Sequence, residues 1–316
     1  MKLVILGGGP AGYAAASAAA HVGGEVTLVE ELSLGGNCTM TDAVPSKTLL
    51  TTADAMLEVA RAEAAGLDFV QGFPEVNLRR TLARARAVAL HQSRGVRERM
   101  DGMNVQVLPG RGRLTGPNTL DLGLDAAGVE FGDRGALPVD ELLRTNVPHI
   151  YACGDVTGQV MLANTAAVHG RTAALHALGI EIEPVAYTGV AWCVFTRPEI
   201  AKAGISERQA RLDGIPVRVT KQLIRANPRA VMEGETDGMI KLLSDPDDGT
   251  ILGGAMVGLR ASEVITAVAL AVHARLSVQV LAETAAVNPS MSESLQRAAE
   301  KAAEGMLGIS RVTLTS

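Results

Sequence analysis

Three glycines near the N-terminus have the spacing of a loop that binds the pyrophosphate of a dinucleotide. Gly7, Gly9 and Gly12 follow a short apolar run at residues 2–6 and open an alanine-rich segment, residues 10–21, that is predicted to be helical. The first glycine permits a tight turn, the second lets the backbone approach a pyrophosphate, and the third lets helix and strand pack closely. The predicted helix N-terminus offers unpaired amides and a partial positive charge to phosphate oxygens.

An acidic residue stands where such a site needs a ribose ligand. Glu30 ends the next predicted strand, residues 26–29, and its carboxylate can accept hydrogen bonds from a ribose hydroxyl. A strand, a helix and a second strand in this order predict a parallel sheet covered by helices. A glycine-rich turn without a ligand would show the same pattern, and the glycines do not distinguish FAD from NAD.

The remaining elements predict two regions with different organisation. In the first, helices are expected at about 45–64, 78–100 and 164–178, with strands at 105–108, 112–114, 119–122 and 148–152. In the second, strands at 190–195, 217–221, 239–243 and 251–257 are expected to alternate with helices at 199–204, 206–212, 261–274, 277–284 and 292–304. We therefore predict an α/β chain in which a Rossmann-like domain is followed by an α+β domain.

Composition excludes several classes of function. The chain has 316 residues, 47% apolar and 20% charged, which is typical of about two soluble globular domains. Its net charge of -5 and the lack of a basic stripe argue against binding of nucleic acid. The cluster of arginines in the predicted helix at 78–100 is expected to be a solvated face. These arginines are Arg79, Arg80, Arg84 and Arg86.

Cysteine and histidine usage gives no metal site and points to the cytoplasm. The three cysteines form no CxxC pair, no histidine has zinc-ligand spacing, and scattered cysteines are typical of a reducing compartment. No apolar run is long enough to cross a membrane.

Residues 35–47, GGNCTMTDAVPSK, resemble the flavin-contacting segment of the pyridine nucleotide-disulfide oxidoreductases, the family of dihydrolipoamide dehydrogenase and glutathione reductase. Three further blocks agree: residues 107–120 resemble the adenine-side strand, residues 144–171 the second FAD segment, and residues 194–204 the start of the dimerisation domain. The resemblance implies FAD as cofactor and a homodimer.

The same resemblance implies the domain limits and the contacts with FAD. The FAD-binding domain would span residues 1–183, and the dimerisation domain residues 186–308. Glu30 and the glycine turn would hold the ADP half, Lys47 would lie near the isoalloxazine ring, and Asp155 would bind the ribityl chain. The implied cofactor-binding residues are Gly7, Gly9, Pro10, Ala11, Gly12, Glu30, Gly36, Asn37, Cys38, Lys47, Gly112, Gly154, Asp155, Met161, Leu162 and Ala163. His169, in the helix after Asp155, could approach the flavin, although the helix surface is the simpler expectation.

The chain departs from the family at the redox pair. The family resemblance implies two thiols beside the flavin, close enough to form a disulfide. Cys38 matches the first position, but the second is Ala43. A single thiol cannot form that disulfide, and a bond from Cys38 to Cys153 or Cys193 is not expected in a cytosolic chain.

Two further departures concern the base and the nucleotide domain. Where the family has a catalytic histidine oriented by a glutamate, the chain has Asn288 and Glu293. Asn288 cannot act as a general base, so Glu293 is expected to have nothing to orient. The two FAD segments join directly near residue 123, where the family inserts an NAD(P) domain, and no second glycine fingerprint follows.

These features favour an FAD oxidoreductase of the quinone-reductase-like subgroup, which lacks the cysteine pair and the histidine. Such a protein would pass electrons from NAD(P)H to a quinone or dye, because these acceptors need no dithiol. Two alternatives remain open. The chain could be a non-catalytic FAD-binding or dimerising remnant that acts as a scaffold, or a shortened form of a full-length enzyme like dihydrolipoamide dehydrogenase.

Overall fold

The computed structural model describes residues 1–68, 72–112, 124 and 127–306 of the chain. These residues belong to two compact units, Met1–Val185 and Ala186–Ser316. The junction near residue 123 and the strand expected at 119–122 lie outside the described residues.

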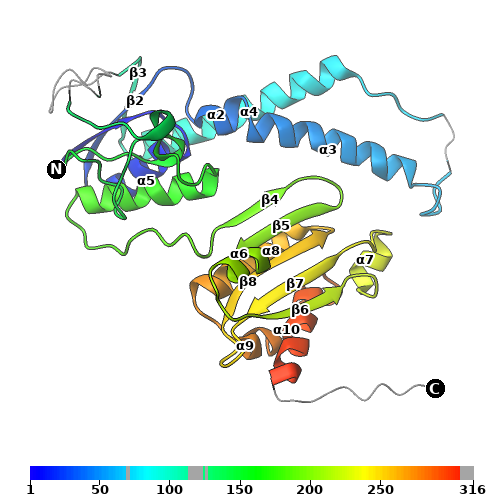
Figure 1. The fold of residues 1–316 in the computed structure, drawn as a ribbon. Coiled ribbons are helices and arrows are strands. Elements are labelled where there is room, and N and C mark those ends of the chain that lie inside the picture. The colour runs from blue at the N-terminus through cyan, green and yellow to red at the C-terminus, as the bar shows by residue number, and fades with distance from the viewer. Residues whose placement is uncertain (69–71, 113–123, 125–126, 307–316) are drawn as a thin grey trace, which may run out of the picture. The chain divides into compact units, whose positions relative to one another are not determined.

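The first unit is built around a parallel sheet of three strands (Figure 1). The strands are β1 (Lys2–Leu6), β2 (Glu25–Glu30) and β3 (Gln106–Pro109). β2 lies in the centre, with Leu6 opposite Val29 on one side and Val29 opposite Leu108 on the other. Helix α1 (Pro10–His21) makes the crossover from β1 to β2, so the predicted Rossmann-like class is confirmed.

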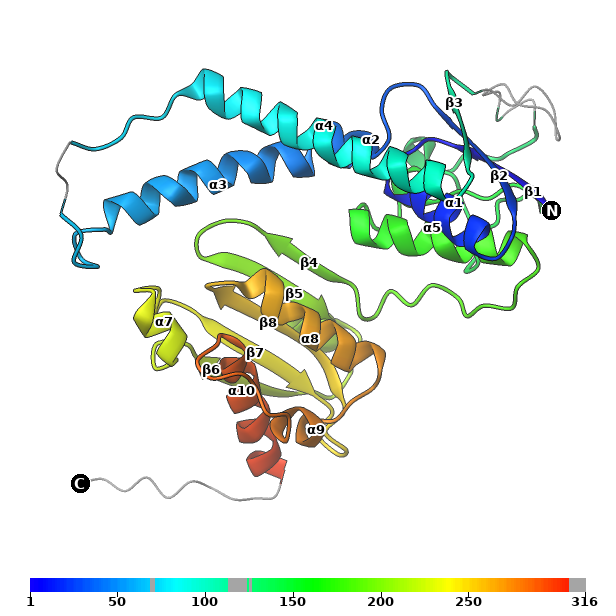
Figure 2. The same cartoon turned by 180° about the vertical axis from the view of Figure 1, so that it is seen from behind.

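Two alanine-rich helices, α1 and α5 (Ala163–Ala177), lie side by side in this unit (Figure 2). Gly170 of α5 makes their close approach possible, because a Cβ there would lie 1.9 Å from the carbonyl oxygen of Ala11. Small residues therefore form the interface. The core beneath it consists mainly of Ala15, Ala16, Ala19, Val26, Leu28, Leu34, Met100, Val105 and Ala174.

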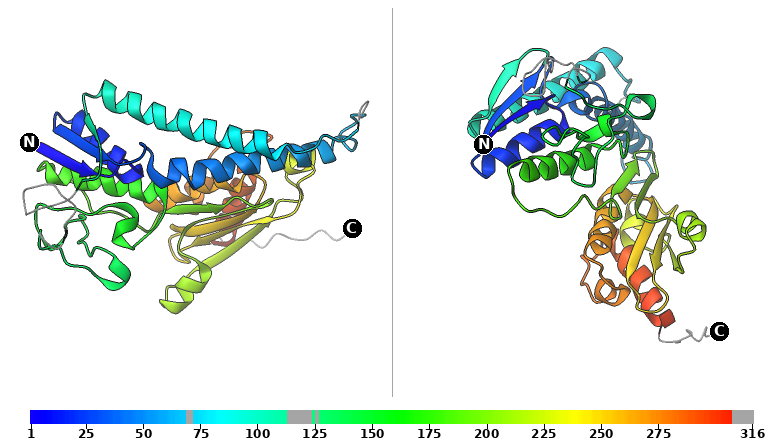
Figure 3. Two further views of the ribbon diagram at one scale, coloured as in Figure 1. Left: turned by 90° about the horizontal axis from the view of Figure 1, so that it is seen from above. Right: turned by 60° about the vertical axis from the view of Figure 1, so that its left-hand side comes forward.

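A helical hairpin extends from the same unit. A short helix, α2 (Gly36–Met40), leads into α3 (Ala43–Ala60), and α4 (Leu78–Gly102) runs beside α3 (Figure 3). Arg84 joins the two long helices, since its Nη1 donates to the carbonyl oxygen of Thr48 at 3.2 Å and to the hydroxyl of Thr51 at 3.0 Å. Arg79, Arg80, Arg84 and Arg86 are all exposed, as expected of a solvated face, but Arg84 is also a tether.

The strand predicted at 148–152 does not join the parallel sheet. Its backbone pairs instead with the segment just before it: Thr145 N–H donates to Ile150 O at 2.9 Å, and Ala152 N–H donates to Leu143 O at 3.1 Å. Local pairing thus takes the hydrogen bonds that a fourth strand would have used. Two 3-10 turns, η1 (Asp133–Gly135) and η2 (Gly154–Thr157), flank this region. Among the described residues, β1 has β2 as its only strand neighbour.

The second unit contains an antiparallel sheet of five strands in the order β4-β5-β8-β7-β6. Helices α8 and α10 pack on it, α8 mainly over β5 and β8 and α10 over β6 and β7 (Figure 2). The elements are β4 (Ala191–Val194), β5 (Glu199–Gly204), α6 (Glu207–Leu212), β6 (Arg218–Leu223), α7 (Pro228–Met232), β7 (Met239–Ser244), β8 (Ile251–Gly258), α8 (Ala261–His273), α9 (Val278–Ala282) and α10 (Ser292–Met306).

The helix predicted at 199–204 is wrong, because these residues form β5. The segment is rich in residues that favour helices, but β5 pairs with β4 on one side and β8 on the other. Its alternation also fits a strand: Ala201 and Ala203 are fully buried, whereas Ile200 on the other face is 41% exposed. Pairing on both sides has overridden local propensity.

Candidate functional site

The glycine turn after β1 has the geometry that its spacing predicts. Gly7 lies in the left-handed region with φ of 93°, and a Cβ on Gly12 would lie 1.8 Å from the carbonyl oxygen of Gly7. A Cβ built on Gly9 would be in ordinary van der Waals contact with Gly36 Cα, at 3.9 Å. Gly7 and Gly12 therefore make the turn tight, and Gly9 adds no side chain at the N-terminus of α1, where a ligand could approach.

Glu30 is fixed beside this turn by hydrogen bonds from the backbone. Its Oε2 accepts from Gly8 N–H at 2.6 Å, and its Oε1 accepts from Leu32 N–H at 2.7 Å. A carboxylate has about four acceptor positions, so capacity remains for hydroxyl groups of a ligand. The role of Gly8 was missed in the sequence, although a Cβ there would lie 3.2 Å from Glu30 Oε2.

The segment at 35–38 lies directly against the turn. Gly35 N–H donates to Gly8 O at 2.7 Å, and a Cβ on Gly36 would lie 2.8 Å from Gly9 Cα. Both Gly35 and Gly36 adopt positive φ, at 99° and 58°, which glycine tolerates without strain. Asn37 is exposed and Cys38 half-buried on the short helix that follows. Two sequence motifs are thereby brought together.

Cys38 lies among charged groups from two segments of the chain. Burial is the main cause that raises the pKa of its thiol above the ordinary value of 9.0; the charges of Asp42 and Asp155 raise it further, and Lys47 opposes them. Asp155 and Lys47 are thus both close enough to Cys38 to act on it electrostatically. Ala43, at the first position of α3, supplies no second thiol, and Cys38 forms no disulfide in the described chain.

The segment from η2 to the start of α5, residues 154–163, also lies against the start of α1. Gly154, with φ of 79°, lies against the start of α1, because a Cβ there would lie 3.4 Å from Ala11 Cβ. Asp155 is exposed in the next position, and Met161, 69% exposed, precedes half-buried Leu162. Ala163 is exposed at the first position of α5, whose first turn has no acidic residue and whose N-cap makes no side-chain hydrogen bond.

His169 is not on the helix surface as expected. Its exposed fraction is 0%, and its Nδ1 lies 3.2 Å from Gly154 N, which donates to it. Burial lowers the pKa of the imidazole below its ordinary value of 6.5. Periodicity places His169 three positions after Ala166 and one before Gly170, both buried, and this pattern could have indicated an inward side chain.

Gly112 lies close to the carboxyl ends of β1 and β2. A Cβ there would lie 2.5 Å from Leu6 Cδ2 and 3.5 Å from Val29 Cγ1. In open parallel sheets this end of the strands is where ligands bind.

The residues gathered here fit a dinucleotide. The backbone at Gly9, which carries no side chain, and the first-turn amides of α1 suit a pyrophosphate, and the fixed carboxylate of Glu30 suits a ribose. Gly154, the residue before Asp155, and Gly170 of α5 both lie against Ala11 of α1. Gly7, Gly8 and Gly9 carry no side chains that could fill the cradle.

Asn288 and Glu293 contradict one expectation. Glu293 does orient a partner, since its Oε1 accepts from Asn288 Nδ2 at 2.6 Å. Its Oε2 accepts from Ser290 N–H at 3.0 Å, and the side chain is 7% exposed. Asn288 therefore stands in place of the family's basic histidine, and its amide keeps the Glu293 carboxylate hydrogen-bonded.

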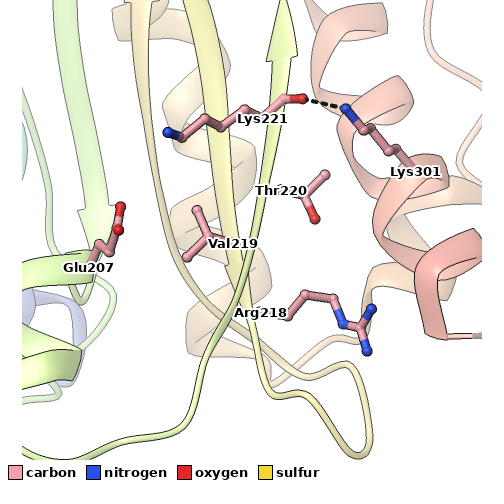
Figure 4. Close-up of a pocket in the computed structure, with 6 residues that line it drawn as sticks. All are labelled: Glu207, Arg218, Val219, Thr220, Lys221 and Lys301. Carbon is pink, nitrogen blue, oxygen red and sulfur yellow. Dashed lines mark hydrogen bonds between the residues drawn. The ribbon is translucent and has the colours of Figure 1, made fainter.

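A shallow hollow of about 490 Å³ lies on the second unit, along the edge strand β6. Figure 4 shows that Lys221 and Arg218 point away from each other, Lys221 toward the side of Glu207 and Arg218 toward α10. Glu207 is already paired with Lys241 at 2.9 Å. The basic groups therefore do not converge as an anion site would require.

No helix in the described part of the chain is long and apolar enough to cross a membrane. The described residues also contain no group of three or more His, Cys, Asp or Glu side chains arranged to hold a metal ion.

Two family profiles cover most of the chain. Residues 1–121 and 106–170 match the pyridine nucleotide-disulphide oxidoreductase profile, and residues 190–299 match the profile of the dimerisation domain of these enzymes.

Several proteins are similar to the chain. Dihydrolipoyl dehydrogenase of Staphylococcus aureus is 33% identical over 308 residues, which cover 95% of this chain and 60% of that protein. NAD(P)H dehydrogenase (quinone) of Mycobacterium tuberculosis is 40% identical over 185 residues, 58% of this chain and 38% of that protein. The chain thus spans about 60% of the length of the dehydrogenases that match nearly all of it.

Solved structures share the fold. The crystal structure of LpdA from Mycobacterium tuberculosis has a TM-score of 0.88 and 26% identity, with 95% of this chain and 99% of that chain covered. The HOCl-induced flavoprotein disulfide reductase RclA of Escherichia coli has a TM-score of 0.80, with the same coverage, but only 19% identity, so this likeness concerns the fold alone.

Proposed function

The chain belongs to the pyridine nucleotide-disulphide oxidoreductase family, and from that premise we propose that it is an FAD flavoprotein that reduces a quinone or dye, not a disulfide. The observation that carries the proposal is the meeting of three separate segments at the start of α1. Gly36 approaches Gly9, and Gly154 approaches Ala11, while the position of the second thiol is Ala43.

Each segment would hold one part of FAD. The first-turn amides of α1 would bind the pyrophosphate, and Glu30, kept in place by Gly8 and Leu32, would accept hydrogen bonds from the ribose. Asp155 would bind the ribityl hydroxyls. The amides at the start of α5, with Ala163 first among them, would face the side of the flavin where negative charge develops.

The chemistry beside the flavin would not pass through a dithiol. Bound FAD supplies electron and hydride transfer, and a quinone can take electrons from the reduced ring without a protein thiol. Cys38 is a single thiol whose raised pKa keeps it protonated at neutral pH. Asn288 is held by Glu293 and has no titratable group to offer as a base.

NAD(P)H is the proposed electron donor, and the relative named NAD(P)H dehydrogenase (quinone) supports it. In the domain division that we propose, the two FAD segments join near residue 123, without the inserted NAD(P) domain of the family. Reduced nicotinamide would therefore have to reach the flavin without that domain.

The visible spectrum of the purified protein tests the cofactor. We expect a flavin absorption band and its loss in Glu30→Ala, with Glu25→Ala, an exposed change on the same strand, as the matched control. Anaerobic mixing with NADH or NADPH should bleach the band, and a quinone should restore it. A yellow protein that neither nucleotide bleaches would contradict NAD(P)H as donor.

A second candidate function is that of a dimerising scaffold. We propose a FAD-binding domain at 1–183 and a dimerisation domain at 186–308, and the match of residues 190–299 to a dimerisation profile supports a homodimer. A colourless, folded dimer would favour this non-catalytic role. A third candidate is a shortened form of a longer dihydrolipoamide dehydrogenase-like enzyme. The intact mass of the protein purified from its natural source would distinguish it.

A further inference from the structure

His169 holds the backbone of the loop that carries Asp155. The Nδ1 atom of this fully buried histidine accepts a hydrogen bond of 3.2 Å from Gly154 N–H. A neutral imidazole that accepts through Nδ1 carries its proton on Nε2. The ring must therefore be neutral and in one tautomer for the contact to exist.

The bond matters because Gly154 is the residue directly before Asp155. Gly154 adopts a positive φ of 79°, and its carbonyl oxygen accepts from Thr157 Oγ1 at 2.8 Å. His169 holds the amide of Gly154 and Thr157 holds its carbonyl, so the peptide groups on both sides of Gly154 are fixed. Asp155 projects from this fixed backbone and is exposed.

We propose that His169 is a positioning residue for the FAD site: its neutral ring fixes the Gly154 amide and so orients Asp155 toward the ribityl chain. The inference rests on the proposed function, because it assigns Asp155 to FAD. Hydrogen exchange at Gly154 tests the role of His169 independently of FAD binding.

The surroundings of the ring oppose its protonation. Burial lowers the pKa of His169, and no charge is among the causes of that shift. On the η2 side the titratable groups are Cys153, whose Sγ lies 3.7 Å from His169 O, and exposed Asp155. On α1 the titratable groups are Tyr13 and His21, while Ala11 and Ala15 meet α5 at Gly170.

A pH dependence follows from the geometry. Protonation of His169 places a second N–H opposite the Gly154 N–H and breaks the contact. Because the folded pKa lies below 6.5, the contact is fully present at neutral pH and is lost as pH falls through the lowered value.

The test combines three variants of the full chain. His169→Asn keeps an acceptor oxygen near the position of Nδ1, His169→Leu removes the acceptor, and His176→Gln is the matched control on the same helix, at a histidine bonded to Tyr151 instead. Two quantities are measured from about pH 7.5 to about pH 5: the dissociation constant of FAD, and hydrogen exchange of the peptide containing Gly154.

We expect FAD affinity to fall toward the acid end of this range in the wild type and in His176→Gln, by about tenfold once the His169 ring is protonated. We expect His169→Leu to be weak by about tenfold at every pH, and His169→Asn to be tight and independent of pH. Exchange at Gly154 should be fast in His169→Leu and slow in His169→Asn. Unchanged Gly154 exchange in His169→Leu, or the same pH profile in His169→Asn as in wild type, would overturn the inference.

If no variant binds FAD but Gly154 exchange follows this pattern, the proposed function fails while the positioning role of His169 stands for the loop alone. If His169→Leu does not fold, the comparison of wild type with His169→Asn still decides the matter, because only the imidazole titrates.

Discussion

The side chain of Asn288 donates a hydrogen bond of 2.6 Å to Oε1 of Glu293, across the turn that leads into α10. Glu293 is nearly buried and also accepts from Ser290 N–H, which lies in the same turn. The carboxylate is therefore a structural acceptor for the turn. A buried carboxylate would be costly without these donors, so the amide of Asn288 stabilises Glu293. The amide cannot act as the base that the family has at this position.

Glu293→Gln should lower the free energy of unfolding by about 1–3 kcal/mol, because it replaces one acceptor with a second amide donor facing Asn288. Asn288→Ala should cost about 1 kcal/mol, since Ser290 N–H still pairs with the carboxylate. Urea denaturation measures both. Glu283→Gln, an exposed change in the same region, is the control and should have no effect. Equal stability of Glu293→Gln and wild type would show that the pair is incidental.

The close approach of α1 and α5 makes Gly170 intolerant of any side chain. A Cβ at Gly170 would lie 1.9 Å from Ala11 O and 3.0 Å from Ala15 N, both backbone atoms that cannot rotate away. Gly170→Ala should therefore destabilise the first unit by about 1–3 kcal/mol or more, despite the better helix propensity of alanine.

The matched control is Gly95→Ala in α4, where nothing lies within 4 Å of the added Cβ. That change should stabilise the protein by about 0.5–1 kcal/mol, because alanine favours the helix. Thermal unfolding followed by circular dichroism measures both variants. A Gly170→Ala protein that melts at the wild-type temperature would mean that α1 and α5 separate readily.

The family and the fold class were predictable from the sequence, because both depend on short motifs with local geometry. The predicted family and fold class are confirmed by the profiles and by the sheet topology. β5 and the segment at 148–152 were predicted wrongly, because their states depend on partners elsewhere in the chain. Likewise the bond from Gly154 to His169 depends on a tertiary contact that no motif records. The bond from Asn288 to Glu293 instead lies within one turn and joins the two positions of a family motif.

Arg84 is predicted to stabilise the hairpin of α3 and α4 more than its arginine neighbours do. Its two hydrogen bonds reach a carbonyl and a hydroxyl of α3, whereas Arg86 is an exposed arginine on the same helix. Arg84→Ala should cost about 1 kcal/mol and speed hydrogen exchange in the middle of α3, and Arg86→Ala should do neither. Identical exchange in the two variants would assign Arg84 to the solvated face only.

The thiols of Cys38 and Cys153 should differ in reactivity. Burial raises the pKa of Cys153 to about 12, and burial with the charge of Asp42 raises that of Cys38. Because only the thiolate is alkylated, both should react slowly with iodoacetamide at neutral pH, Cys38 faster than Cys153, and both faster as pH rises. Labelling resolved by peptide mass spectrometry measures the rates, with urea-unfolded protein as the reference for full reactivity.

Two charge variants test the direction in which each neighbouring charge shifts the pKa of Cys38. Asp42→Asn removes a charge that raises the pKa, so labelling should quicken by about twofold at fixed pH. Lys47→Met removes the charge that lowers the pKa, so labelling should slow by a similar factor of about two. Neither change should affect Cys153, whose pKa is raised by burial alone. If both variants shift the rate in the same direction, the thiol is controlled by access and not by the charges around it.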